Sequence, residues 1–328
     1  MLFGDIETAL AAVTKTRSRL AKVDALAEVL RALSPDEVVP AVGLLTAAPR
    51  QGRLGVGWRT LSSRGGSHAD TPMLTVGDVD ETFTRLTEIG GAGSAARRTA
   101  LLDDLAERAT LAEWQLLIRV MTGELRTGAL EGVLLDAIAR ASDRDGAAVR
   151  RAAMLSGDLG ETARVALTGS VDDLAAVGLV VGRGVQPMLA STAGSVAEAL
   201  EIAGVASVEY KLDGARVQVH RRGDEVRVFT RTLADVTHRV PEIVEVVRAL
   251  PVTDVILDGE TLSLDDDGAP RPFQDTMARF GAETAREIAL RPWFFDVLHV
   301  DGRDLVDRPL SARLAELDRI AAGWRIPA

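Results

Sequence analysis

The segment VEYKLDGARVQVHRRGDEVRVFTR, residues 208–231, predicts a β-hairpin and carries a lysine that needs an explanation. Valines alternate with polar residues at 217–219 and again at 226–228, on either side of the turn sequence Arg-Arg-Gly-Asp at 221–224. Two runs of period two separated by a short turn are typical of antiparallel strands joined by a hairpin. Lys211 falls inside the alternating pattern, two residues before an Asp-Gly pair, so the pattern predicts a strand position for it.

Lys211 is unusual because arginine supplies almost all of the positive charge in this chain. Lysine and arginine together number 38, and only three of them are lysines. One interpretation places Lys211 on an exposed strand edge, which a lysine protects, with the Asp-Gly pair as the turn. The other interpretation is chemical, because a lysine can lose its proton and attack an electrophile, whereas an arginine cannot. A free lysine titrates near ~10.4, so a nucleophilic lysine needs desolvation or neighbouring cations, and Arg216 and Arg231 are the candidates.

Length and composition are those of an ordinary globular protein. The chain has 328 residues, enough for two domains, of which 47% are hydrophobic and 26% charged. The absence of cysteine excludes disulfides, thiolate metal sites and a cysteine nucleophile. No apolar run is long enough to span a bilayer, and the first residues lack the basic region of a signal peptide, so we expect a cytoplasmic protein without a membrane partner. The net charge of −10 argues against wholesale binding to nucleic acid, although local basic patches decide that question.

The first half of the chain has helical periodicity. Apolar residues recur at helical spacing over residues 20–33 and 129–141. The sequences Ser-Pro-Asp-Glu at 34–37 and Thr-Leu-Ala-Glu at 110–113 are capping-box signals, which predict two further helix starts. This half is therefore predicted to be all-helical.

The character of the sequence changes near residues 182–184. Beyond them, strand patterns of period two end at turn sequences, Asp-Asp-Asp-Gly at 265–268 and Asp-Gly at 301–302. We predict a helical domain over residues 1–185 and an α+β domain with an antiparallel sheet over residues 186–328.

Residues 211–216, Lys-Leu-Asp-Gly-Ala-Arg, resemble the Lys-x-Asp-Gly-x-Arg signature of the covalent nucleotidyltransferases, a group that includes ATP-dependent DNA ligases and mRNA capping enzymes. Further segments are similar to motifs of the same group and follow in the same order. They are Val-Phe-Thr-Arg at 228–231, Ile-Leu-Asp-Gly-Glu at 256–260, Pro-Phe-Gln at 272–274 and Phe-Phe-Asp-Val-Leu at 294–298. One signature alone is moderate evidence, whereas a series in register is strong.

The resemblance implies three phosphoryl-transfer steps. The Lys211 amine attacks the α-phosphate of ATP and holds AMP as a phosphoramidate, AMP then moves to the 5′-phosphate of a DNA nick, and the neighbouring 3′-hydroxyl finally displaces it. Arginines and Mg²⁺ are the expected stabilisers of the phosphate charge. The implied roles are Glu209 near the adenine, Arg216 on the ribose or phosphate side, Arg231 near the phosphates, Glu260 at the ribose and the metal, and Phe295 on the face of the adenine ring.

Single residues of this set have plainer interpretations. Phe295 taken alone fits a core position, and Arg231 taken alone fits a solvated strand. Glu260 is harder to explain in this way, because a carboxylate in an apolar strand needs a partner. The position of each residue within the ordered series supports the functional assignment.

The helical half adds a resemblance of its own. Residues 123–131 resemble a helix-joining segment in the DNA-binding domain of large ATP-dependent DNA ligases, and residues 53–58 are similar to a glycine-rich loop there. Residues 155–161 and 187–190 fit the same family. On this basis Arg126 and the glycine-rich loop would contact the DNA backbone without reading its sequence. The alternative is that these glycines only terminate helices.

The resemblance covers about residues 1–320 and is closest to bacterial and archaeal ATP-dependent DNA ligases. That family continues with a glutamate-glycine motif, a lysine-bearing strand and an OB-fold domain, none of which follows in this sequence, which ends at Ala328. The resemblance thus implies a helical DNA-binding domain and the N-terminal part of an adenylation domain, without the OB-fold domain. We expect weak or no complete ligation by this chain alone.

The resemblance also implies partners and alternatives. Nicked duplex DNA is the expected partner of a monomeric protein acting in DNA repair, replication or recombination. One alternative is a catalytically silent DNA-binding fragment. Another is an RNA-ligating or capping nucleotidyltransferase, against which the helical half argues.

Overall fold

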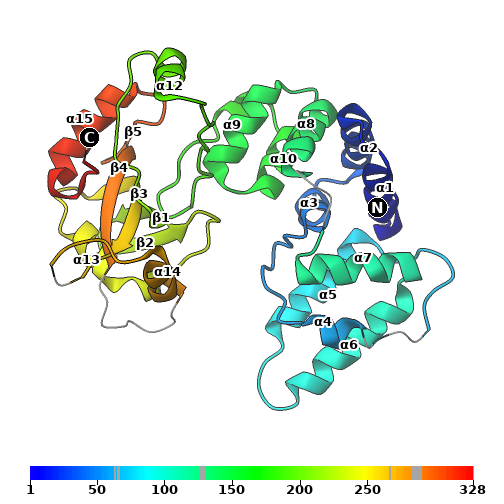
Figure 1. Ribbon diagram of the computed structural model, residues 1–328. Helices are drawn as coiled ribbons and strands as arrows, with labels where there is room; N and C mark the ends of the chain where they lie inside the picture. The colour runs from blue at the N-terminus through cyan, green and yellow to red at the C-terminus, as the bar shows by residue number, and fades with distance from the viewer. Residues whose placement is uncertain (63, 65–66, 126–129, 266, 282–289, 328) are drawn as a thin grey trace. The chain divides into compact units, whose positions relative to one another are not determined.

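The computed structural model describes residues 1–62, 64, 67–125, 130–265, 267–281 and 290–327. The chain divides into two compact units, Met1–Ala153 with Asp158–Val177 and Met154–Gly157 with Gly178–Ala328. Figure 1 shows helices in the first unit and a sheet with flanking helices in the second. The predicted domain boundary lies between residues 185 and 186. In the structure the first unit ends at Val177, a few residues earlier in the chain.

The regular secondary structure described in the first unit is helical, apart from one isolated β-bridge between Leu2 and Thr75. A single apolar core runs through this unit. The helices are α1 Phe3–Lys15, α2 Arg19–Ala32, α3 Val38–Thr46, α4 Trp58–Ser62, α5 Val76–Glu88, α6 Ser94–Arg108, α7 Leu111–Thr122, α8 Leu130–Ser142, α9 Gly146–Ser156, α10 Leu159–Thr168 and α11 Val171–Ala175.

One predicted helix start is confirmed and the other is wrong. Thr110 caps α7, because its hydroxyl accepts from the Glu113 N–H at 3.3 Å and the Glu113 carboxylate accepts from the Thr110 N–H at 2.8 Å. Ser34 also bonds to the Glu37 carboxylate, through its N–H at 3.0 Å and its hydroxyl at 2.8 Å, but α3 begins only at Val38. The reason is that Glu37 closes a turn with its own N–H on the Ser34 carbonyl and binds the Met1 ammonium group. It is therefore the N-cap residue of α3 and not a residue inside a first helical turn.

The second unit contains a five-stranded antiparallel sheet in the order β2-β1-β3-β4-β5. The predicted hairpin is confirmed, since β1 and β2 pair from Val217 with Thr230 to Arg222 with Glu225. The strands are β1 Ala215–Arg222, β2 Glu225–Thr230, β3 Asp254–Ser263, β4 Leu290–Val300 and β5 Arg303–Asp304. The helices are α12 Val196–Ala203, η1 Thr237–Arg239, α13 Pro241–Arg248, α14 Phe273–Gly281, α15 Leu310–Ala321 and η2 Ala322–Trp324.

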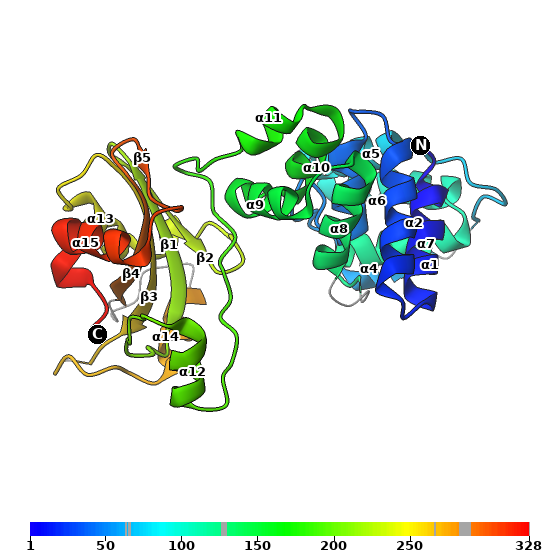
Figure 2. The same ribbon diagram turned by 90° about the horizontal axis from the view of Figure 1, so that it is seen from above.

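The two faces of this sheet differ in chemistry. Directly paired residues of antiparallel strands point to the same face, and Arg216 pairs with Glu260 while Gln218 pairs with Asp258. One face is therefore polar. The opposite face joins the core formed with α13 and α15, which lie on the same side of the sheet (Figure 2), and its strand residues include Val217, Val219, Leu257, Phe294 and Val297.

His220 continues the polar face and is buried there, with only 1% of its surface exposed. Its Nδ1 accepts from the Gly182 N–H at 3.0 Å, so Nε2 carries the proton and donates to the Gln218 Oε1 at 2.9 Å. Gln218 in turn bonds both the N–H and the carbonyl of Val185, at 2.7 and 3.1 Å. This network fastens residues 182–185 to the sheet and requires a neutral imidazole.

The burial of His220 predicts a loss of stability in acid. Burial lowers the pKa of the imidazole to about 3, from 6.5 in the unfolded chain. Below pH 6.5 the unfolded chain therefore binds a proton that the folded chain does not, and stability falls as the pH drops. At pH 5 the loss from this group is about 2 kcal/mol.

Urea unfolding at pH 7 and pH 5 measures this loss. In His220→Gln the difference between the two pH values should shrink by about 2 kcal/mol. An equal difference in both proteins would contradict a neutral, buried His220.

Candidate active site

Lys211 lies in an irregular segment immediately before β1, so its predicted place inside a strand is wrong. The strand begins only at Ala215. At Gly214 the segment passes so close to β3 that an added Cβ would meet the Thr261 carbonyl oxygen at 2.2 Å. The ladder between β1 and β3 begins only with Ala215 and Thr261, so the segment that carries Lys211 lies outside it. Lys211 itself is exposed, and the preceding Tyr210 N–H donates to the Pro327 carbonyl at 3.3 Å.

A cavity of about 720 Å³ opens beside Lys211 in the second unit. It brings together four of the residues predicted from sequence, Lys211, Arg216, Arg231 and Glu260. Its other walls come from residues 188–190, the segment after β2 and the helix α14. The remaining lining residues are Met188, Leu189, Ala190, Asp213, Gly214, Ala215, Thr230, Thr232, Ala234, Val236, Arg239, Phe273 and Met277.

The two other predicted residues, Glu209 and Phe295, do not line this cavity. Glu209 accepts a hydrogen bond from the Ser207 hydroxyl at 3.0 Å. Phe295 is half-buried on β4, and its ring centroid lies 5.5 Å from the guanidinium carbon of Arg216. Phe295 is therefore one contact away from the cavity, and the adenine contacts predicted for both residues remain predictions.

Arg216 is held by a carboxylate that was not picked out from the sequence. Its Nε and Nη2 donate to the two carboxylate oxygens of Asp258 at 3.0 and 2.6 Å, and its Nη1 donates to the Met188 carbonyl at 3.1 Å. Asp258 is 7% exposed, and its burial raises the pKa of the carboxyl while the bonds from Arg216 oppose that rise. The available signal was the period of the strand, because Asp258 lies two residues before Glu260 and so on the same face.

Glu260 presents a carboxylate to the cavity from β3. Its Oε1 accepts from the Gly214 N–H at 3.2 Å, which ties β3 to the segment carrying Lys211. Burial raises the pKa of Glu260, while the Gly214 N–H and the positive charges of Lys211 and Arg216 lower it. A carboxylate in this position can accept from a hydroxyl group or bind a cation.

Both Asp-Gly pairs of the site need glycine because backbones meet there. A Cβ on Gly259 would lie 2.4 Å from the Trp293 carbonyl oxygen, and one on Gly214 would meet the Thr261 carbonyl. Neither glycine has a left-handed backbone, so close approach and not turn geometry explains the residue type.

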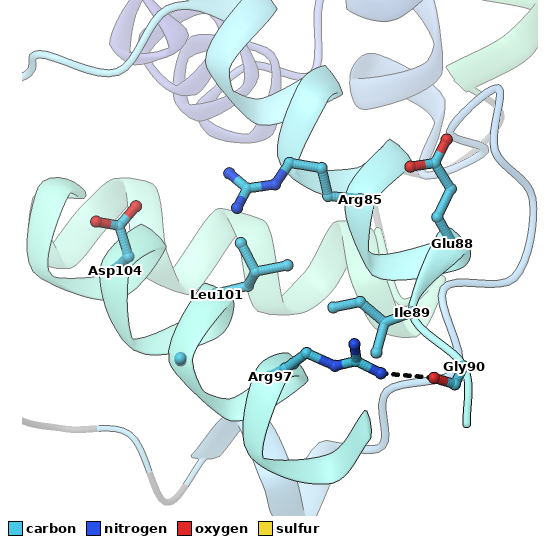
Figure 3. A pocket seen from close by; sticks show the side chains of 8 residues that line it. Arg85, Glu88, Ile89, Gly90, Arg97, Leu101 and Asp104 are labelled. Carbon is cyan, nitrogen blue, oxygen red and sulfur yellow. Dashed lines mark hydrogen bonds between the residues drawn. The ribbon is translucent and has the colours of Figure 1, made fainter. Parts of the chain in front are cut away.

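A second cavity, of about 650 Å³, lies in the first unit between α5 and α6 (Figure 3). Arg85 and Arg97 line it together with Glu88 and Asp104, so its charges balance. The Arg97 guanidinium donates a hydrogen bond to the Gly90 carbonyl at 2.6 Å. The cavity beside Lys211, with its unequal charges, is the better candidate site.

The predicted DNA-backbone residues of the first unit are only partly described. Arg126 lies outside the described residues. The glycine-rich loop is described, and it leads to Trp58, which is 55% exposed at the start of α4. Arg98 of α6 donates to the Leu54 and Gly55 carbonyls at 3.3 Å each, which fixes the loop to that helix.

Comparisons with known proteins show the family of the chain. A family model described as "ATP dependent DNA ligase domain" matches residues 187–325, and one described as "DNA ligase N terminus" matches residues 59–139. A "Probable DNA ligase" of Pseudarthrobacter chlorophenolicus is 63% identical over all of this chain, and one of Nocardia farcinica is 49% identical over all of it and 67% of that relative. The chain belongs to the ATP-dependent DNA ligase family.

The chain matches only part of the length of its relatives. The chain spans 64% of the length of the Pseudarthrobacter relative and 65% of a Rhodococcus jostii "Probable DNA ligase" to which it is 56% identical. The chain can be superposed on the solved structure "Pmar-Lig_PreS3" with a TM-score of 0.58. This match covers 96% of the present chain and 62% of the chain in that structure. At 18% identity this likeness supports the fold alone. In the part of the chain that the structure describes, no helix is both long and apolar enough to cross a membrane.

Proposed function

We propose that this chain carries the nucleotide-transfer chemistry of an ATP-dependent DNA ligase, with Lys211 as the nucleophile. The observation that carries the proposal is the single cavity that gathers Lys211, Arg216, Arg231 and Glu260 from three separate segments. A lysine beside arginines suits attack on a phosphate. The family membership of the chain supports the same reaction.

In the first proposed step the neutral amine of Lys211 attacks the α-phosphorus of ATP. A nitrogen–phosphorus bond forms, the bond from phosphorus to the pyrophosphate oxygen breaks, and the amine loses its proton. Negative charge spreads over the phosphate oxygens during this step, so fixed cations around them lower its barrier. Arg231 lines the cavity, and Arg216 is oriented by its two bonds to Asp258.

The later proposed steps need DNA. AMP passes from Lys211 to the 5′-phosphate of a nick, and the neighbouring 3′-hydroxyl displaces it to seal the strand. The helical unit would hold the duplex through backbone contacts, for which the loop at residues 53–58 is the described candidate. Action as a monomer in the cytoplasm, in repair, replication or recombination, belongs to this proposal.

Glu260 is the residue proposed to hold Mg²⁺. Among the described residues no group of three or more His, Cys, Asp or Glu side chains is placed to bind a metal ion. Mg²⁺ in nucleotide sites is bound by one or two carboxylates together with phosphates and water, so the single carboxylate of Glu260 fits that mode. When bound, the ion would neutralise phosphate charge. Glu209 and Phe295 are proposed to contact the adenine.

ATP labelled in its α-phosphate tests the proposal. With a divalent cation present, label should stay on the protein through denaturation, and mass spectrometry should locate one added AMP on Lys211. Binding of nicked DNA without any label would favour a catalytically silent DNA-binding fragment. Labelling by GTP in preference to ATP would favour a capping enzyme.

Gly214→Ala should lower the rate of this labelling by about 10²-fold. The added methyl group cannot fit against the Thr261 carbonyl, so the segment carrying Lys211 must move away from β3, and a displacement of ~1 Å in a reacting group has an effect of this size. Gly323→Ala is the matched control, because a Cβ there meets nothing within 4 Å. Equal labelling rates in the two variants would show that this close approach does not position Lys211.

A further inference from the structure

We propose that Arg239 is a phosphate-binding residue of the cavity beside Lys211, and that the buried Arg279 holds it in position. The inference rests on the proposed function and adds two residues to it. Neither arginine belongs to the sequence motifs that predicted the site.

The side chain of Arg239 reaches the cavity without a strong partner. Arg239 is the last residue of the short helix η1 and lines the same cavity as Lys211 and Arg231. Its Nε lies 3.4 Å from the Nε2 of His238, a weak contact between neighbouring residues. Within the described ranges no carboxylate forms an ion pair with Arg231 or Arg239.

The charges of the cavity are therefore unequal. Arg216 is neutralised by Asp258. Among the described residues, Lys211, Arg231 and Arg239 share the cavity lining with two carboxylates, those of Asp213 and Glu260. A cavity with surplus cationic groups attracts an anion of more than one charge. A guanidinium matches the oxygens of a phosphate in geometry as well as in charge.

The buried side chain of Arg279 fixes the backbone of Arg239. Arg279, on α14, is 2% exposed. Its Nη1 donates to the Arg239 carbonyl at 2.8 Å, and its Nη2 donates to the Glu242 carboxylate at 2.7 Å. The same Glu242 oxygen accepts from the Leu290 N–H at 3.0 Å. Arg279 thus joins η1, α13, α14 and the start of β4.

This connection gives Arg279 a positioning role. The helix that carries Arg279 also supplies Phe273 and Met277 to the cavity wall. A second buried bond, from the Ser263 N–H to the Thr276 hydroxyl at 3.0 Å, fixes that helix to β3. These bonds fix the position of Arg239 relative to the cavity wall formed by α14. The guanidinium is therefore preorganised for binding a phosphate.

The phosphate has two possible sources, the β- and γ-phosphates of ATP or a phosphate of the nicked strand. Equilibrium binding to the full chain, in EDTA so that no transfer occurs, separates them. The probes are ATP, AMP, and a nicked duplex with or without its 5′-phosphate. Arg239→Gln should weaken binding of either ATP or the 5′-phosphorylated duplex by about 10- to 100-fold, the effect of one hydrogen bond to a charged group, and leave AMP binding unchanged.

Controls separate the proposed roles from loss of folding. Arg239→Lys should restore part of the affinity, and Arg222→Gln, at an exposed site outside the cavity, should change nothing. Arg279→Gln should lower the ratio of ATP to AMP affinity, or of phosphorylated to unphosphorylated nick affinity, in the direction seen for Arg239→Gln. A merely structural Arg279 would weaken all probes alike.

The outcomes distinguish this inference from the proposed function. If the unaltered chain binds its nucleotide and forms the AMP adduct, but Arg239→Gln binds every probe as tightly as the unaltered chain does, the inference is wrong and the proposed function stands. If the unaltered chain binds neither ATP nor nicked DNA, the proposed function fails and the inference fails with it.

Discussion

Lys211→Arg is expected to abolish formation of the covalent AMP adduct, with a loss of at least about 10³-fold in labelling rate. The variant keeps a positive charge at the same place, so electrostatic attraction of ATP to the cavity is retained. A guanidinium does not lose its proton in proteins, and it therefore has no free electron pair for attack on phosphorus. ATP binding in EDTA should stay within a few-fold of the unaltered protein while labelling disappears.

Lys15→Arg is the matched control for this change. Lys15 is an exposed lysine at the end of α1 in the first unit, and its substitution should leave labelling intact. Because the chain has only three lysines, a peptide map assigns the adduct without ambiguity. An adduct that persists in Lys211→Arg would remove the basis of the proposed chemistry.

Arg216→Met should destabilise the second unit by about 3 kcal/mol, because it leaves Asp258 buried without its cation. Asp258 is 7% exposed and takes both of its strong bonds from Arg216. The variant also loses the bond to the Met188 carbonyl and the contact with Phe295. Urea unfolding monitored by tryptophan fluorescence measures the change.

The double variant Arg216→Met with Asp258→Leu should recover at least half of that stability. Replacing both members of a buried ion pair by apolar side chains avoids the unpaired charge. Adduct formation should not recover with stability, because the cation beside the cavity is still missing. Parallel recovery of stability and labelling would show that Arg216 serves the fold and not the chemistry.

The strand and helix predictions succeeded where the signal is local. Period-two valines predicted the pairing of β1 with β2, and Thr110 with Glu113 predicted the start of α7, because each pattern depends on residues a few positions apart. The same reasoning failed for Glu37, whose partner is the Met1 ammonium group. It also failed for Lys211, because β1 begins only at Ala215.

The candidate site shows the same division. The order of short motifs along the chain predicted six residues as one site. The cavity contains four of them, Lys211, Arg216, Arg231 and Glu260, and their roles remain predictions. Arg239 and Arg279 carry no such motif. Arg279 donates to the backbone carbonyl of Arg239, which lies forty positions earlier in the sequence. A periodic pattern in the sequence cannot predict a contact between residues so far apart.

The sequence by itself determined the alternation that builds the sheet, the helical first half and the residue types that a phosphate chemistry needs, since these depend on each residue and its near neighbours. Only the tertiary structure decided that Asp258 neutralises Arg216, that Phe295 contacts that arginine outside the cavity, and that Arg239 lines the cavity with no ion-pair partner among the described residues. The physical reason is that charge pairing and burial depend on distances in space between strands and helices far apart in the chain, and those distances exist only once the sheet has closed against its helices.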